Sequence, residues 1–192
     1  MSVSFAPAPY TEPWLRGTHT DVPAAARAVL NALELSLDDL TKWTAGLTDA
    51  EIHCSPLGLP SIAFHLRHIA RSVDRILTYA EGRQLSAGQL AALKTEQTGS
   101  EQSGAEQTGS EQVGEGKLES LANLLAEVEI SFNDAADRIR VVATADLNTP
   151  RFVGRMQLPT SIGGAMIHVA DHTQRHTGQV VTTAKVVKAL RT

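Results

Sequence analysis

Hydrophobic residues recur at helical spacing in four long segments of the chain, and polar or proline-containing stretches separate these segments. Apolar residues at every third or fourth position lie on one face of a helix. Prolines and glycines punctuate the loops 48–60 and 146–159, in which only residues 151–153 suggest a short extended piece. Since no strand pattern of any length competes, the chain is predicted to be all-α, with helices over residues 21–45, 61–81, 118–143 and 160–189.

The ends of the predicted helices carry recognisable start and stop residues. Asp21 is the expected N-cap of the first helix, with Pro23 in its first turn, where a missing N–H costs nothing. Gly46 provides a C-terminal stop. Ser61 is the expected cap of the second helix and Gly82 its expected end.

Two segments differ from this helical pattern. Residues 1–20 are predicted to form an extended N-terminal arm, because three prolines interrupt them and because Tyr10 and Trp14 could pin the arm to the body. The segment 94–116 repeats Thr-Gly-Ser-Glu-Gln and has almost no apolar residue to offset the entropy of ordering. It is predicted to be a flexible low-complexity insertion within a helical domain spanning 21–192. A connection of this length lets the second and third helices run parallel, which predicts a four-helix bundle with one long crossover.

The composition of the chain limits the kinds of molecule that it is expected to bind. The chain has 192 residues, of which 42% are hydrophobic, enough for one domain with a core. Its net charge of −4 and an aromatic content of 4% argue against a nucleic-acid partner, which needs a cationic or stacking surface. The single cysteine, Cys54, excludes an intrachain disulfide and a cysteine-rich metal knuckle.

The hydropathy of the chain also bears on location. No stretch approaches the roughly 20 apolar residues of a membrane-spanning helix. The N-terminal residues lack the basic start and the apolar run of a signal peptide. A cytoplasmic protein with no membrane partner is therefore expected.

Five of the seven histidines fall on the second and fourth predicted helices. His168, His172 and His176 share one face of the fourth helix, since four residues advance about 400° on a helix of roughly 100° per residue. Neighbouring imidazoles on such a face can bind one divalent ion, and His65 or His68 of the second helix could supply a further ligand. Ordinary buried or surface histidines are the alternative, but stacked imidazoles repel when protonated and need partners when neutral.

Further polar residues are expected near these histidines. Arg75 and Tyr79 fall near the face of His68, and Arg175 falls near that of His176. The two arginines are either solvated rim residues or a binding site for an anionic group of a substrate. Asp171 is either exposed or orients an imidazole.

The segments Pro60-Ser-Ile-Ala-Phe-His-Leu-Arg-His68-Ile-Ala and His168-Val-Ala-Asp-His172-Thr-Gln-Arg-His176-Thr-Gly-Gln179 resemble the DinB-like (DinB/YfiT-like) metalloenzymes. The resemblance covers roughly residues 22–190 without the insertion. It implies a four-helix bundle with an up-down-down-up course and a metal, zinc or nickel, held by His68, His172 and His176. His65 and His168 are then residues of the pocket. Some members of this group resemble thiol-dependent transferases or isomerases, and many have no assigned activity.

Three functions follow as hypotheses. The first is a metal-dependent enzyme, either a thiol-dependent S-transferase or a hydrolase, acting on a small molecule with a low-molecular-weight thiol as one expected partner. Its pocket candidates are His65, His168, Tyr79, Arg75 and Arg175. The second is a non-catalytic metal-binding bundle, structural or sensing, with His65 or His168 as a fourth ligand. The third is an interaction protein that forms a homodimer.

Overall fold

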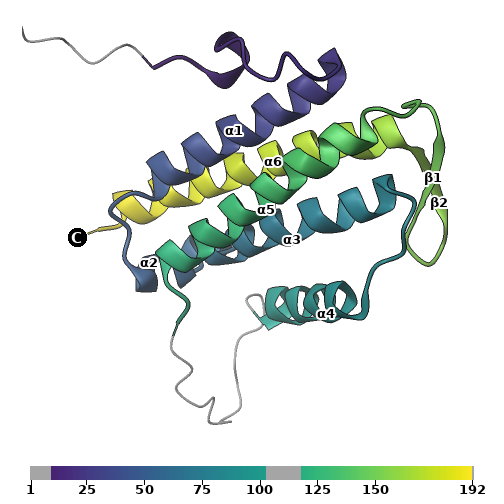
Figure 1. Cartoon of the computed structure of the whole chain (residues 1–192). Helices are drawn as coiled ribbons and strands as arrows, with labels where there is room; N and C mark the ends of the chain where they lie inside the picture. The colour runs from purple at the N-terminus through teal and green to yellow at the C-terminus, as the bar shows by residue number, and fades with distance from the viewer. Residues whose placement is uncertain (1–9, 103–117, 192) are drawn as a thin grey trace, which may run out of the picture.

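The computed structural model describes residues 10–102 and 118–191. Within these ranges the chain is mostly helical, with one small antiparallel sheet (Figure 1). The helices are α1 (Ala24–Thr44), α2 (Asp49–His53), α3 (Ile62–Ala80), α4 (Ala87–Gln102), α5 (Leu121–Val142) and α6 (Ile162–Ala189). The four long predicted helices correspond to α1, α3, α5 and α6, whereas α2, α4 and the sheet were not predicted.

The four long helices pack against one another around a shared core. α1 packs on α5 and α6, and α3 packs on the same two helices. Figure 1 shows that α3 and α5 run from the α2 end of the molecule toward the sheet, while α1 and α6 run back. Each helix contributes fully buried apolar side chains, among them Leu40, Ile69, Ile139 and Val169. In the described part of the chain, no helix is both long and apolar enough to cross a lipid bilayer.

The capping residues predicted from the sequence are found at some helix ends and not at others. The side chain of Ser61 accepts a hydrogen bond of 3.1 Å from the backbone N–H of Phe64, so the predicted cap of α3 is confirmed. Gly46 has a φ of +75°, the left-handed conformation that ends a helix at little cost for glycine. The predicted Asp21 cap is wrong, because the N-cap of α1 lies two residues later, at Pro23, which makes no side-chain capping bond.

The predicted loop 48–60 contains the short helix α2. Its capping box is complete: the backbone N–H of Glu51 donates to the Thr48 hydroxyl, and the backbone N–H of Thr48 donates to the Glu51 carboxylate. Two reciprocal bonds satisfy N–H groups that a short helix leaves without partners. A single turn is too short for a hydrophobic period, which is why the pattern did not predict it.

A β-hairpin occupies the predicted loop 146–159. Strands β1 (Pro150–Val153) and β2 (Leu158–Ser161) pair antiparallel, so the extended piece predicted at 151–153 is one half of a sheet. The Arg151 Nε donates to the Ala80 carbonyl at 2.7 Å, which joins the hairpin to the end of α3. Strands of four residues carry too little alternation to be recognised from sequence.

The described part of the N-terminal arm is attached to α1 by polar contacts, one of which comes from Tyr10. Its described part contains one 3-10 turn, Pro13–Leu15, and the predicted arm residues 1–9 lie outside the described residues. Tyr10 and Trp14 are mainly exposed, although the Tyr10 hydroxyl donates to Asp38. Arg16 pairs with the same carboxylate at 2.6 Å. Charged groups on α1 therefore provide the attachment.

The largest difference from the sequence prediction concerns α4. Residues 94–102 continue this helix, whereas a flexible insertion was predicted to begin at Lys94. The remainder of the predicted insertion lies outside the described residues. A reciprocal pair of bonds between Ser86 and Gln89 caps the start of α4. The helix lies alongside α3, on which it packs (Figure 1).

Candidate metal centre

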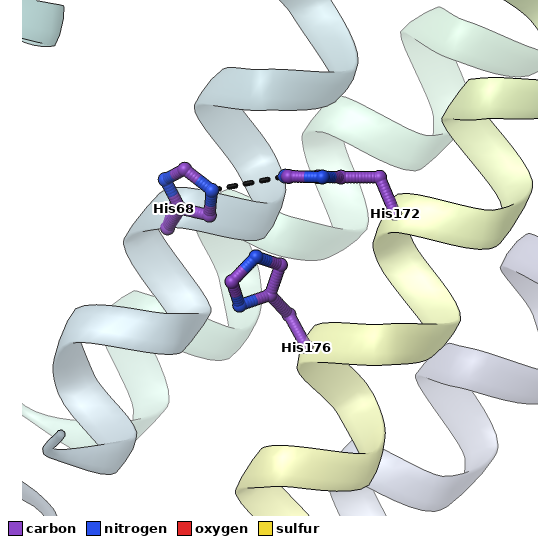
Figure 2. A group of neighbouring side chains, drawn as sticks. All are labelled: His68, His172 and His176. Atoms are coloured by element: carbon purple, nitrogen blue, oxygen red, sulfur yellow. Dashed lines mark hydrogen bonds between the residues drawn. The ribbon is translucent and has the colours of Figure 1, made fainter.

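Three imidazoles from two helices meet at one point between α3 and α6. His68 comes from α3, and His172 and His176 come from successive turns of α6. One ring nitrogen from each residue can be chosen so that all three lie within 4.8 Å of one another. Figure 2 shows the His68 and His172 rings approaching through their Nε2 atoms, 2.9 Å apart, with a His176 nitrogen pointing toward the same space. The three histidines named from the sequence are thus neighbours in space.

The spacing and the protonation of these imidazoles suit a divalent transition metal. A tetrahedral zinc ion with Zn–N bonds of about 2.0–2.1 Å separates its nitrogen ligands by roughly 3.3 Å. One observed separation, between Nε2 of His68 and Nε2 of His172, is 2.9 Å, and all three nitrogens lie within 4.8 Å of one another, a spacing compatible with such a site. Burial, followed by repulsion from neighbouring imidazoles, lowers the pKa of His172 and of His176 to about 4. Both rings are therefore neutral at pH 7 and keep a lone pair for a metal.

His65 lies behind the cluster and is 2% exposed. Its Nδ1 is 3.0 Å from Nδ1 of His176, so one of the two rings must donate the proton of this bond. If His176 donates, its Nε2 is free for a metal and the His65 proton is on Nε2. That atom is buried without a hydrogen-bond partner in the described structure. Burial, then the neighbouring imidazoles, lowers the pKa of His65 to about 4.

A carboxylate that the sequence did not reveal completes the surroundings of His68. Glu96 of α4 accepts a bond of 3.1 Å from Nδ1 of His68. The same carboxylate accepts two bonds from Arg75, at 2.9 and 3.0 Å. Nothing distinguishes Glu96 locally from the other glutamates of the repeats. The capping pair Ser86 and Gln89 is the one sequence signal that could have extended a helix to it.

A pocket of about 370 Å³ opens beside the histidines, between α3, α4, α6 and the hairpin. Its polar lining includes His68, His172 and His168, and Tyr79 and Arg75 line it as well. The other walls are largely apolar, formed by Ile76, Leu85, Leu93, Val153 and Ala165 among others. A larger hollow of about 780 Å³ lies along α1 and shares no lining residue with the histidine cluster. The smaller pocket is therefore the one placed for chemistry at the histidines.

Of the other predicted pocket residues, His168 and Arg75 line the pocket, whereas His65 and Arg175 do not. His168 lies at the edge of the pocket, half exposed, with its Nδ1 2.8 Å from the carboxylate of Asp171. Arg175 is exposed and does not line the pocket, but its charge helps to lower the pKa of His172 and His176 after burial and the neighbouring imidazoles. Arg75 lines the pocket with its charge already paired to Glu96.

Comparison with known proteins adds one positive finding. A family model described as the DinB superfamily matches residues 32–180, which include all three clustered histidines. No curated protein sequence matches the chain. The match confirms the family resemblance that the two histidine-containing segments indicated.

Proposed function

Since the chain belongs to the DinB superfamily, we propose that it is a metal-dependent enzyme in which His68, His172 and His176 hold one divalent ion, zinc or nickel. The observation that carries this proposal is that one ring nitrogen from each of the three imidazoles lies within 4.8 Å of the others, beside a pocket of about 370 Å³ that His68 and His172 line. Three imidazole ligands leave a coordination position for water or substrate, as catalytic zinc sites do.

A structural metal site would instead need a fourth protein ligand. His65 and His168 were the candidates for that position. Among the described residues, neither belongs to the group whose ligand atoms lie within 4.8 Å of one another. The arrangement therefore favours an open site over a closed one, and an enzyme over a metal staple between helices.

The architecture supports this assignment. We propose that α1, α3, α5 and α6 form the four-helix bundle of the family in an up-down-down-up course, with the long crossover between α3 and α5. The pairwise packing of these helices and the shared direction of α3 and α5 support it (Figure 1). This course places the two histidine-bearing helices, α3 and α6, in direct contact.

The chain's own residues suggest how the site works. A bound divalent ion supplies Lewis acidity, which lowers the pKa of a water or a thiol. The apolar walls of the pocket exclude water and accept the apolar part of a small substrate. His168, beside Asp171 at the edge, is placed to carry a proton to or from that substrate. Because Arg75 is occupied by Glu96, an anionic group would have to compete with a carboxylate for it.

Two reaction classes fit such a site: transfer involving a low-molecular-weight thiol, and metal-assisted hydrolysis. Elemental analysis of protein purified without chelators should find about one equivalent of zinc, nickel or a related metal. The loaded protein should then turn over either a thiol with an electrophile or an ester or amide, with His172→Ala as the inactive control. Protein that contains no metal and takes none up on titration would contradict the proposal.

A further inference from the structure

Helix α4 contacts the site through one face. Gln89, Leu93 and Glu96 are spaced four and three residues apart, which places them on the same side of a helix. The Gln89 amide donates to Asp74 at 2.7 Å and to Thr78 at 2.8 Å, both on α3. Leu93 lines the pocket, and Glu96 reaches His68. One row of side chains thus docks α4 on α3 and ends at the histidine cluster.

Glu96 is held unusually tightly for a residue in a polar segment. It is 8% exposed, and its two oxygens accept three bonds from His68 and Arg75. A second guanidinium, that of Arg71, lies 3.9 Å from the Glu96 carboxylate. Burial raises the pKa of Glu96, but the bonds from His68 and Arg75 outweigh it and hold that pKa below its usual value. The group is therefore an anion at neutral pH, with its charge balanced by Arg75.

We propose that Glu96 is a positioning residue for the metal centre, presenting the Nε2 lone pair of His68 to the metal by accepting the proton on Nδ1. A neutral imidazole has one N–H, so a proton kept on Nδ1 leaves Nε2 unprotonated. Carboxylates that orient a metal-binding histidine in this way also raise its basicity. The bond to Arg75 fixes the carboxylate in both position and charge. This inference rests on the proposed metal site and assigns α4 a part in it, although α4 carries no ligand.

Metal binding and the docking of α4 are then thermodynamically coupled. If docked Glu96 increases the affinity of the histidines for a metal, the bound metal must stabilise docked α4 by the same factor. Leu93 is on the same face, so a more firmly docked α4 also gives the pocket a more fixed wall. Amide exchange in α4 should consequently slow when zinc is added to the full-length protein.

The test compares zinc affinity in matched variants, measured at pH 7 by competition with a chelator. Glu96→Gln should bind zinc roughly 10–100-fold more weakly than the natural chain. Glu119→Gln is the control. Glu119 accepts a bond of 2.9 Å from Arg67, which lies on α3 as His68 does, but it contacts none of the clustered histidines. It should keep the natural affinity. Equal affinity of Glu96→Gln and the natural chain would overturn the proposal.

A second measurement separates positioning from a structural role. Nitrogen-15 NMR of the metal-free protein should show His68 protonated on Nδ1, and the Glu96→Gln variant should show a mixture of the two tautomers. An Nε2–H tautomer in the natural chain would overturn the proposal even if the variant failed to fold. A natural chain that binds no zinc would instead contradict the proposed function, so the two failures are distinguishable.

Discussion

Helices α6 and α4 each place a polar group beside His68, but the patterns of their sequences differ. Nε2 of His172 on α6 lies 2.9 Å from one ring nitrogen of His68, and the Glu96 carboxylate on α4 lies 3.1 Å from the other. The histidines of α6 repeat every four residues, whereas Glu96 stands in polar sequence among similar glutamates. A regular spacing reveals residues that share a helix face, while a single residue recruited from another segment leaves no pattern.

The two helices also differ in how firmly they are held. α6 packs along both α1 and α3 and contributes buried residues such as Met166, Val169 and Val180 to the core. α4 packs chiefly on α3, and its contacts to that helix are largely polar. Elements with few buried apolar contacts open at lower free energy. The histidines of α6 are therefore expected to stay in place while α4 detaches and docks.

The largest expected effect concerns a ligand on α6. Loss of a residue that orients a ligand weakens metal affinity roughly 10–100-fold. His172→Ala should weaken zinc affinity by more than this, because it removes a ligand itself. The rise in melting temperature on adding zinc should disappear with it. His168→Ala, one turn earlier on α6, is the matched control and should bind zinc normally. Equal loss in both variants would show that the ligand assignment is wrong.

The second effect is a pH dependence of the metal-free protein. His65, His172 and His176 have pKa values of about 4 in the folded chain, below the ordinary value of about 6.5. Between these values the unfolded chain binds more protons than the folded one, so stability is complete above pH 6.5 and is lost as the pH falls toward 4. Chemical unfolding at several pH values measures this loss. A flat free energy of unfolding across that window would contradict the neutral, buried cluster.

A smaller effect should follow from removing the partner of Glu96 on α3. Arg75→Met leaves a buried carboxylate with His68 as its main remaining donor, and the expected cost is about 1–3 kcal/mol, seen first as faster amide exchange in α4. Arg67→Met is the control, since its pair with Glu119 is more exposed and should contribute less than about 1 kcal/mol. Similar exchange in α4 for both variants would argue against docking through Glu96.

The smallest effect compares two helix caps. Ser86→Ala removes the cap of α4 and should cost about 1 kcal/mol, confined to the amide exchange of that helix. Ser120→Ala removes the cap of α5, where the same loss should lower the melting temperature of the whole protein, because α5 packs on α1 and α3. A global change in the Ser86 variant would show that α4 is part of the cooperative core.

Elements with long local patterns could be predicted from the sequence. Four helices and the Ser61 cap were predicted correctly, because each rests on many periodic positions or on a bond within three residues. The helix α2 and the hairpin could not be predicted, because their elements have four or five residues, too few to show a period. The N-cap of α1 was predicted two residues early, at Asp21, whereas it is Pro23.

By itself the sequence determined the long helices, the histidine face of α6 and the membership of the DinB superfamily. These depend on regular spacing along one segment, which the geometry of a helix converts directly into a shared face. Only the tertiary structure decided that Glu96 joins His68 and Arg75, and that Arg175 does not line the pocket. Such contacts join residues from separate elements, and they depend on packing that no local pattern records.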